Sequence, residues 1–357
     1  MSREVLAPPL MRMGPNRCYR VNLIHEDFSS QYGATQGSQQ QAQASSKTYA
    51  EEDLYGDDYN DELDAEVDCQ IEETNNGMFK LAMHVASSFY GGIIGHKGST
   101  KRRIETEAQC DITIPQRNAT QKQANSKIII KAKTRNNVLS ARRKIQLLLT
   151  SLRKRMAPTH FYGVALNFGE IQEKFVNLRK QIMSAEIAGI EESIFQSENA
   201  IHLTFGTCVL MDEVERSRAM EILQSCREFL NDLKPPFTVH VSGLEIMNDD
   251  PSSVRVLYAL VESPELQIFA NRCFQRFNQS GFGFDDFDRG NVKLHMTVMN
   301  NRYRNSDAKS FDSREILKRW SNYDFGTAQC NELLLCVIGG SAKDTSVFYK
   351  ITDSMKF

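Results

Sequence analysis

The pentapeptide IHLTF at residues 201–205 recurs as LHMTV at residues 294–298. Each copy is an apolar residue, a histidine, an apolar residue, a threonine and another apolar residue, in a chain with seven histidines. Strict alternation of this kind is typical of a β-strand with one buried face. The two pentapeptides therefore predict two equivalent strands, each presenting a histidine and a threonine on the same side.

The surrounding sequence extends this correspondence into a longer repeat. Each copy is predicted to contain a strand, a helix, the HxT strand, a helix and a strand. The predicted elements of the first copy are a strand at 160–167, a helix at 169–188, a helix at 212–233 and a strand at 237–247 around IHLTF. Those of the second are a strand at 254–261, a helix at 264–280, a helix at 312–321 and a strand at 332–339 around LHMTV, with a last strand at 347–352. Residues 158–357 thus form a diverged internal duplication.

The duplication predicts a pair of matched histidines. On a strand, His202 and Thr204 share one face about 7 Å apart, and His295 and Thr297 do the same. If the two copies face each other, one imidazole can accept a proton from an attacking oxygen while the other donates a proton to the leaving oxygen. Imidazole titrates near neutral pH, so one ring can be neutral while the other is charged. The threonine hydroxyls are suited to bind phosphoryl oxygens, and no metal or cofactor is required.

On these two motifs, residues 158–357 resemble the 2H phosphoesterase family. The resemblance implies a bilobed, pseudo-duplicated, LigT-like α+β fold, with His202, Thr204, His295 and Thr297 as catalytic residues. It also implies action on RNA ends, 2′,3′-cyclic phosphates or 2′,5′ linkages. The sequence does not choose among these and 3′,5′ linkages, nor does it say which histidine is the acid.

A basic segment precedes the duplication. Residues 78–158 hold seventeen Lys and Arg against three acidic residues, although the whole chain has a net charge of −2. A basic domain of this kind predicts a polyanionic partner. Hydrophobic periodicity and turn residues give the order β-α-α-β-β-α, with strands at 78–85, 110–115 and 127–133 and a last helix at 135–155.

A glycine loop lies between the first two predicted helices of this segment. The sequence GHKG at residues 95–98 lacks the GK[ST] ending of a P-loop. Together with the element order it resembles the GxxG loop of a type I KH domain, in which backbone amides clamp single-stranded nucleic acid. The resemblance implies RNA contacts by Gly95, His96, Lys97, Gly98, Lys101 and Arg102. Two residues depart from the KH pattern. Lys101 occupies a position that is usually apolar, where it either disturbs the binding groove or adds a phosphate contact. Gln109 replaces a common glycine.

The first 76 residues are predicted to be disordered. A Gln/Ser/Ala-rich tract leads into residues 51–73, which hold twelve acidic residues and no Lys or Arg. Residues 7–24 (APPLMRMGPNRCYRVNLI) are more apolar and are either a short partner-binding motif or part of an unstructured tail. Nothing resembles a signal peptide or a membrane span. The eight cysteines form no CxxC, which favours reduced intracellular thiols.

The expected organisation is therefore a disordered region at 1–76, a KH domain at 77–157 and a phosphoesterase domain at 158–357. This combination resembles a subunit of a nuclear, helicase-containing complex that acts in transcription coactivation and the response to alkylation damage. The resemblance implies single-stranded RNA and that complex as partners, a nuclear location and no membrane association. An RNA-binding phosphodiesterase and a catalytically inactive RNA-binding adaptor remain the two interpretations.

Other candidate groups have weaker signals. His160 and His240 lack a threonine two residues later and are predicted to occupy core or edge positions. The acidic clusters at 248–251 and 284–290 are predicted to be turns, because neither has the ligand spacing of a calcium loop. Arg302, Tyr303 and Arg304 follow the second motif and belong either to the substrate site or to a solvated loop.

Overall fold

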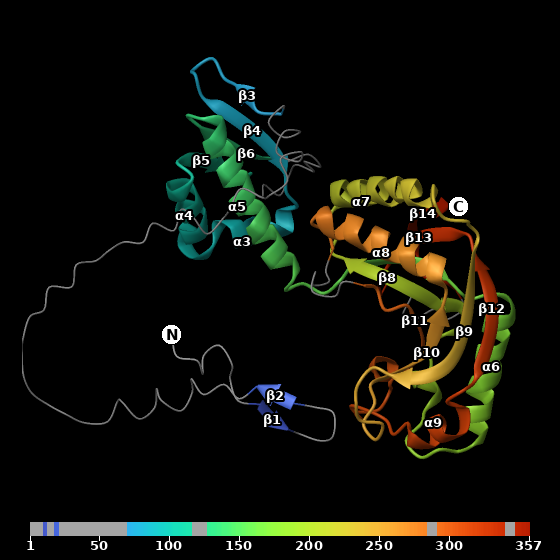
Figure 1. Ribbon diagram of the computed structural model, residues 1–357. Coiled ribbons are helices and arrows are strands. Elements are labelled where there is room, and N and C mark those ends of the chain that lie inside the picture. The colour runs from blue at the N-terminus through green and yellow to red at the C-terminus, as the bar shows by residue number, and fades with distance from the viewer. Residues whose placement is uncertain (1–9, 13–17, 21–69, 116–126, 284–290, 340–346) are drawn as a thin grey trace, which may run out of the picture. The chain divides into compact units, whose positions relative to one another are not determined.

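The computed structural model (Figure 1) describes residues 10–12, 18–20, 70–115, 127–283, 291–339 and 347–357. Most of the region predicted to be disordered, and the turn predicted at 284–290, lie outside the described residues. Residues 1–59 and 60–357 form separate compact units. In the first unit, strands β1 (Leu10–Arg12) and β2 (Cys18–Arg20) form a two-stranded antiparallel sheet. The apolar segment at 7–24 thus contains regular backbone pairing.

The basic segment folds with the predicted order of elements. Its elements are β4 (Phe79–His84), α3 (Tyr90–Ile94), α4 (Ser99–Glu107), β5 (Cys110–Thr113), β6 (Lys127–Ala132) and α5 (Arg135–Arg153). A short strand β3 (Glu72–Glu73) pairs with β4 and gives the sheet order β3-β4-β6-β5. The boundary expected at residue 77 therefore falls inside a hairpin, because β3 adds an edge strand that its acidic sequence did not predict.

Helix α5 shows why this segment folds as it does. Thr134 caps its start by accepting a hydrogen bond from the amide of Asn137 at 3.2 Å. Val138, Ala141 and Ile145 are fully buried against the sheet, at the three-to-four spacing of one helix face. The helix ends at Arg153, two residues before the predicted end, and Arg153 is itself buried.

The duplicated region forms one antiparallel sheet with the strand order β12-β9-β10-β11-β8-β7-β13-β14. The α+β, pseudo-duplicated fold predicted from the sequence is confirmed. Its elements are β7 (His160–Ala165), α6 (Gly169–Ser184), β8 (His202–Cys208), α7 (Glu213–Ser225), β9 (Phe237–Ile246), β10 (Val256–Glu262), α8 (Pro264–Gln279), β11 (His295–Asn300), α9 (Arg314–Trp320), β12 (Asp324–Cys330), β13 (Glu332–Val337) and β14 (Ile351–Lys356).

The last strand of each copy joins the other half of the sheet. Strand β9 is the last strand of the first copy but pairs with β10 of the second. Strand β13 is the last strand of the second copy but pairs with β7 of the first. Each half of the sheet, β9-β10-β11 and β8-β7-β13, is thus completed by the other copy. Residue patterns report strands but not which strands pair, so the sequence did not reveal this exchange.

Several predicted element bounds in the duplicated region differ from the structure. The helix at 169–188 ends at Ser184, and the helix at 212–233 changes to a 3₁₀ turn at Cys226–Leu230. The last strand is at Ile351–Lys356, later than predicted. Strand β12 was not predicted, because its glycine and its exposed polar residues weaken the strand pattern at this edge of the sheet.

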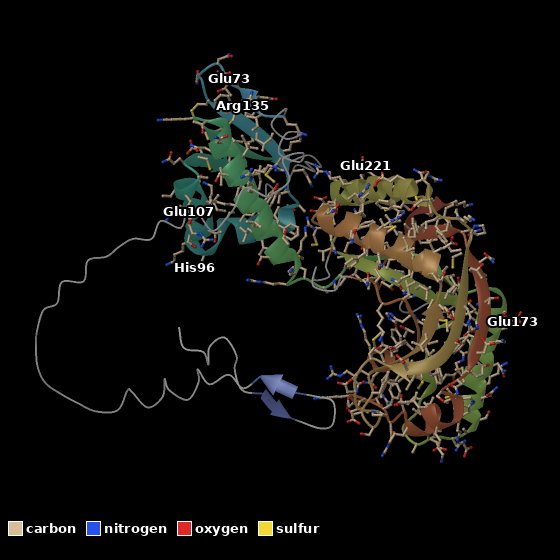
Figure 2. All side chains as sticks on the ribbon, in the orientation of Figure 1. Glu73, His96, Glu107, Arg135, Glu173 and Glu221 are labelled. Carbon is tan, nitrogen blue, oxygen red and sulfur yellow. The ribbon has the colours of Figure 1, made fainter. Side chains whose placement is uncertain are left out.

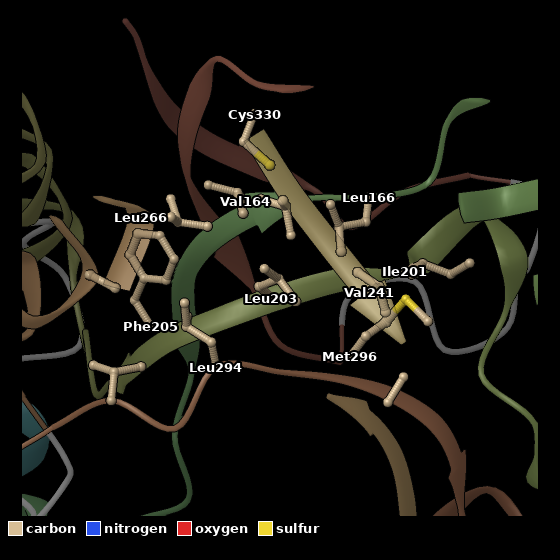
Figure 3. Packing of buried hydrophobic residues seen from close by; sticks show 14 of the residues in the cluster. Val164, Leu166, Ile201, Leu203, Phe205, Val241, Leu266, Leu294, Met296 and Cys330 are labelled. Atoms are coloured by element: carbon tan, nitrogen blue, oxygen red, sulfur yellow. The ribbon is translucent and has the colours of Figure 1, made fainter. Parts of the chain in front are cut away.

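Alternation along the two central strands separates a core face from a polar face. Leu203 and Phe205 of β8 and Met296 of β11 are buried in one hydrophobic cluster with residues of α6, α7 and α8 (Figure 3). The intervening histidines and threonines are only half-buried and point to the opposite side. We call this side, which carries His202, Thr204, His295 and Thr297, the HxT face.

Candidate active site and nucleic-acid loop

The two HxT strands are neighbours at the centre of the sheet. Strands β8 and β11 are antiparallel, and Leu203 pairs with Met296. This register places His202 beside Thr297 and Thr204 beside His295 on the HxT face. The structure therefore brings together all four residues that the sequence predicted as catalytic.

A matched pair of β-bulges flanks the four side chains. The pairing of β7 with β8 shifts between Tyr162 and Gly163, so Phe205 is the extra residue directly after Thr204. The pairing of β10 with β11 shifts between Leu257 and Tyr258, so Val298 is the extra residue directly after Thr297. Bulges change the direction of nearby side chains and are frequent beside active sites. The duplication therefore extends to the backbone distortion at the site.

Gly163 has a steric role at the first bulge. A Cβ atom built on Gly163 would lie 2.0 Å from the carbonyl oxygen of Leu203. This approach of two backbones is possible only without a side chain. Gly163 is therefore required for the close packing of β7 against the HxT strand.

Both histidines are held by the same hydrogen bond. Nδ1 of His202 donates to the carbonyl oxygen of Ala200 at 2.7 Å, and Nδ1 of His295 donates to the carbonyl oxygen of Lys293 at 2.8 Å. Because a carbonyl only accepts, each neutral ring carries its proton on Nδ1. The lone pair of each Nε2 is then available to accept a proton from a substrate.

An aromatic pair surrounds His202. The ring of Phe161 lies 4.6 Å from the imidazole and the ring of Tyr349 lies 5.1 Å away, edge-on. Burial lowers the pKa of His202 to about 4. The hydrogen bond to Ala200 opposes this shift, and the nearby His295 adds to it. Burial also raises the pKa of Tyr349 to about 12. His202 is therefore neutral at physiological pH in the unliganded protein.

His295 has more polar surroundings. The ring of Tyr258 lies 5.5 Å away, edge-on. The ammonium of Lys293 lies 4.6 Å from the centroid of the same ring. Burial lowers the pKa of His295. The hydrogen bond to the Lys293 carbonyl opposes this shift, and the charge of the Lys293 ammonium adds to it. Sequence reasoning missed Phe161, Tyr258, Lys293 and Tyr349, although the two-residue spacing of Lys293 and His295 was a usable signal.

The other predicted groups lie in structural positions. His160 is buried and its Nδ1 lies 2.8 Å from the hydroxyl of Thr159, while His240 is half-exposed and pairs with Asp324 at 3.1 Å. The cluster at 248–251 forms a turn in which Asp250 accepts hydrogen bonds from Ser252. Neither histidine shares the HxT face arrangement.

The three residues after the second motif have different environments. The guanidinium of Arg304 pairs with Glu191 at 2.7 Å and is nearly buried. Tyr303 is 40% exposed and hydrogen-bonds Tyr349, which connects the second motif to the aromatic residues beside His202. Arg302 lies in a 3₁₀ turn that Asn300 caps by accepting its amide hydrogen bond.

The glycine loop of the basic domain has the conformation that its sequence requires. Gly95 has φ 71° and Gly98 has φ 79°, and Lys97 also has positive φ, 51°. A Cβ on Gly95 would lie 2.2 Å from Oγ1 of Thr100, whereas space is available at Gly98. His96 and Lys97 are exposed, and Figure 2 shows His96 at the end of the domain where α3 and α4 meet. The amides of Gly95 and Gly98 already donate to the carbonyls of Gly91 and Gly95. The loop therefore presents the side chains of His96 and Lys97 to solvent, and the lysine ammonium is suited to bind a phosphate.

The two departures from the KH pattern have structural consequences. Nζ of Lys101 pairs with Glu105 at 2.9 Å, and Glu105 accepts the amide hydrogen bond of Ile112 at 2.8 Å. Lys101 is therefore linked through Glu105 to β5. Gln109 has φ 48°, a conformation that favours glycine. Arg102 is exposed one turn into α4.

A buried ion pair links α5 to α7. Arg153 donates to Glu215 at 3.1 Å through Nη1 and makes a shorter contact through Nη2. Its guanidinium also donates to the carbonyl of Val209 at 2.6 Å and lies over the ring of Phe89, 4.6 Å away. His84 of β4 contacts Asp212 at 2.9 Å beside this pair.

Metal-binding clusters and membrane spans are both absent from the described residues. Across those ranges, no group of three or more His, Cys, Asp or Glu side chains is placed to hold a metal ion. Within the same ranges, no helix combines the length and apolar character needed to cross a bilayer.

Comparison with known proteins identifies both domains. Residues 158–357 match the model of the AKAP7 2′5′ RNA ligase-like domain. The chain belongs to the AKAP7 2′5′ RNA ligase-like family. Residues 80–147 match the KH domain. The KH and 2H phosphoesterase resemblances are thus confirmed, and this member of the AKAP7 2′5′ RNA ligase-like family combines an RNA-binding KH module with a phosphoesterase-family domain.

This AKAP7 2′5′ RNA ligase-like chain also has a curated relative with a similar extent. Activating signal cointegrator 1 complex subunit 1 of Mus musculus is 35% identical over 292 residues, which cover 74% of this chain and 80% of the relative. Among solved structures, TT0787 of Thermus thermophilus is 15% identical with a TM-score of 0.40 and covers 56% of this chain and 97% of its own. E. coli LigT complexed with NADP+ is 15% identical with a TM-score of 0.36, over 56% and 97%.

Proposed function

We propose that this chain is an RNA-binding phosphodiesterase in which the KH domain binds single-stranded RNA and the HxT face performs acid–base chemistry on a phosphodiester. The observation that carries the proposal is the matched pair of histidines, each with Nδ1 bound to a carbonyl and Nε2 available. A purely structural histidine has no need of a partner with the same hydrogen bond on the neighbouring strand.

The chemistry is a pair of proton transfers. Nε2 of one histidine accepts the proton of an attacking hydroxyl, from water or from an adjacent ribose, while a new P–O bond forms. The bond to the leaving oxygen breaks, and Nε2 of the other, protonated histidine donates its proton to that oxygen. Thr204 and Thr297 donate hydrogen bonds to the non-bridging oxygens. The unliganded imidazoles resist protonation, and the negative phosphodiester offsets this by favouring the charged ring.

The proposed RNA contacts of the KH domain are centred on its loop. Gly95, His96, Lys97 and Gly98 bind the phosphate backbone, and Arg102 follows one helical turn later. Lys101 is the weakest of the predicted contacts, because its ammonium already pairs with Glu105. This ion pair favours a structural role over an extra phosphate contact.

We further infer the cellular setting from the mouse relative, whose name assigns it to the activating signal cointegrator 1 complex. We propose that this chain is a nuclear subunit of that helicase-containing complex, with roles in transcription regulation and the alkylation damage response. Co-purification with the helicase from nuclear extract, and its loss when residues 1–30 are deleted, would support this setting. Unchanged co-purification after the deletion would show that those residues are not the docking segment.

A panel of short labelled RNAs tests the activity. The panel contains 2′,5′ and 3′,5′ linkages and 2′,3′-cyclic phosphate ends, with EDTA in every reaction because the proposed proton transfers use no metal ion. We expect turnover of at least one linkage by the wild type, and loss of that turnover in His202→Ala and His295→Ala. His240→Ala is the matched control, because this half-exposed histidine is paired with Asp324.

The adaptor interpretation makes the opposite prediction. If the wild type binds RNA but cleaves no member of the panel, the phosphoesterase domain acts as a binding module. In that case the histidine variants should alter RNA binding only where it involves the HxT face.

A further inference from the structure

The two halves of the HxT face differ in chemistry although their backbones match. Beside His202 the side chains are apolar and aromatic, and Phe161, Leu334 and Cys336 form a small buried cluster against which Tyr349 packs. Beside His295 the strand pairings place Glu245, Tyr258 and Leu260 on the same face. One half of the site is therefore apolar, and the other is polar.

Lys293 is the residue that most clearly breaks the symmetry. It lies two residues before His295, and its carbonyl oxygen accepts the Nδ1 hydrogen bond of that ring at 2.8 Å. Ala200 has the equivalent position before His202 and the equivalent hydrogen bond. Both residues lie just before their HxT strand, in the segment that leads into it. The duplication thus places a lysine in one half where the other half has only a methyl group.

The ammonium of Lys293 is held in place by two further side chains. It donates to the hydroxyl of Tyr258 at 2.5 Å, and that hydroxyl donates to Oε2 of Glu245 at 2.6 Å. A phenol has one proton, so donation to Glu245 leaves the oxygen of Tyr258 to accept from Lys293. Of the three ammonium protons, one is used in this bond. Glu245 and Tyr258 therefore fix the position of a charged group that retains donors for a ligand.

We propose that Lys293 binds a phosphate oxygen of the substrate, with Tyr258 and Glu245 as its positioning residues. The proposal rests on the phosphoesterase function proposed above and adds the orientation in which the substrate binds. The anionic part of the substrate lies on the half with β10 and β11, and its apolar part lies against Phe161 and Tyr349 in the other half.

The charges around His295 are consistent with this assignment. The charged and titratable groups around His295 are Lys293 in the segment before β11, Tyr258 on β10, Glu245 on β9 and His202 on β8. Glu245 is separated from Lys293 by the Tyr258 hydroxyl. A substrate phosphate is thus the group that brings a negative charge directly to Lys293.

Binding of two probes that differ only in charge tests the proposal. Adenosine 3′-monophosphate carries the phosphate, and adenosine is its neutral counterpart. Lys293→Met should weaken binding of the monophosphate on the order of 10- to 100-fold, the usual effect of losing a hydrogen bond between charged groups. Binding of adenosine should be unchanged. Lys293→Arg retains the charge and should recover most of the affinity.

Further variants separate positioning from folding. Tyr258→Phe keeps the ring but removes both hydrogen bonds, and should cause a smaller, still phosphate-specific loss. Lys318→Met on α9 is the matched control, because this lysine side chain is 78% exposed, and it should bind both probes as the wild type does.

The outcomes distinguish this proposal from the one on which it rests. Equal loss of monophosphate and adenosine binding in Lys293→Met, or no loss of either, would overturn the assignment. Phosphate-specific loss in a protein that cleaves no RNA would retain the anion site and reject the phosphodiesterase activity. If the protein cleaves RNA but Lys293→Met binds the monophosphate as the wild type does, the phosphodiesterase activity is retained and the anion site is rejected.

Discussion

Leu203 lies opposite Met296 where strands β8 and β11 meet. This pair points into the core, and the residues on either side of it point the other way, so each histidine lies beside the threonine of the other copy. The two H-x-T motifs are therefore one arrangement of four side chains, which belongs to neither copy alone.

This arrangement predicts strong coupling between the histidines. His202→Ala and His295→Ala should each lower turnover by about two to four orders of magnitude, the usual contribution of a positioned acid or base. The double variant should be little slower than either single variant, because both proton transfers belong to one step. Steady-state rates on the preferred linkage test this. Additive losses, or full activity in either single variant, would contradict a shared role.

The pH dependence of kcat/KM should be bell-shaped, with its maximum below pH 6.5, the ordinary pKa of a histidine. Burial lowers the pKa of both rings, that of His202 to about 4. In the free protein, both limbs of the kcat/KM profile therefore lie below pH 6.5. The bound phosphodiester favours the charged ring, so the profile of kcat should lie at higher pH. Rates measured from pH 4 to 9 on one substrate test this. A profile that rises steadily to high pH would indicate a different mechanism.

The KH loop should matter for long RNAs only. Lys97→Asp should weaken binding of RNAs that reach both domains, and should reduce the salt dependence of that binding by roughly 0.7 in log–log slope for each lost phosphate contact. Cleavage of a dinucleotide should be nearly unaffected. Titrations at several salt concentrations test this, with Lys131→Asp, at an exposed position of β6, as the control. Equal loss for long and short substrates would mean that the loop acts through folding.

The ion pair of Arg153 and Glu215 should dominate the junction between the domains. Arg153→Met leaves a buried carboxylate without its partner and should lower the free energy of unfolding by about 3–5 kcal/mol. The double variant Arg153→Met/Glu215→Leu should recover part of this loss in the free energy of unfolding. Arg314→Ala breaks an exposed pair and should have a far smaller effect on stability, because water and salt screen that pair.

Denaturation followed by two probes, one in each domain, measures this junction. We propose that the domains hold a fixed orientation, so the wild type should unfold in one transition and Arg153→Met in two. Two separate transitions in the wild type would show that the domains are not coupled.

His160 should make the protein acid-sensitive. Burial, with a contribution from Arg216, lowers the pKa of His160 from 6.5 to about 4. Because the unfolded chain takes up this proton first, stability falls as the pH decreases from about 6.5 toward 4, by up to about 3 kcal/mol. His160→Phe should reduce this fall, and the half-exposed control His240→Gln should not. Urea unfolding at several pH values between 7 and 4.5 tests it. An identical fall in wild type and His160→Phe would contradict the prediction.

Local sequence was sufficient for several parts of the fold. Alternation at residues 201–205 and 294–298 predicted both HxT strands and the side on which each histidine lies. The three-to-four spacing in α5 predicted its buried face. Both follow from the fixed periods of strand and helix, which depend on neighbouring residues alone. Strand β12 was missed because an edge strand with exposed polar residues has little of this alternation.

The sequence by itself determined that two equivalent strands each carry a histidine and a threonine, that a basic domain carries a GHKG loop, and that the fold is a duplication. The tertiary structure decided that β9 and β13 exchange between the halves, that Lys293, Tyr258 and Glu245 gather beside His295, and that Phe161 and Tyr349 enclose His202. The physical reason is distance along the chain. Periodicity reports which way a side chain points, whereas contacts between residues far apart depend on strand pairing, which one sequence does not encode locally.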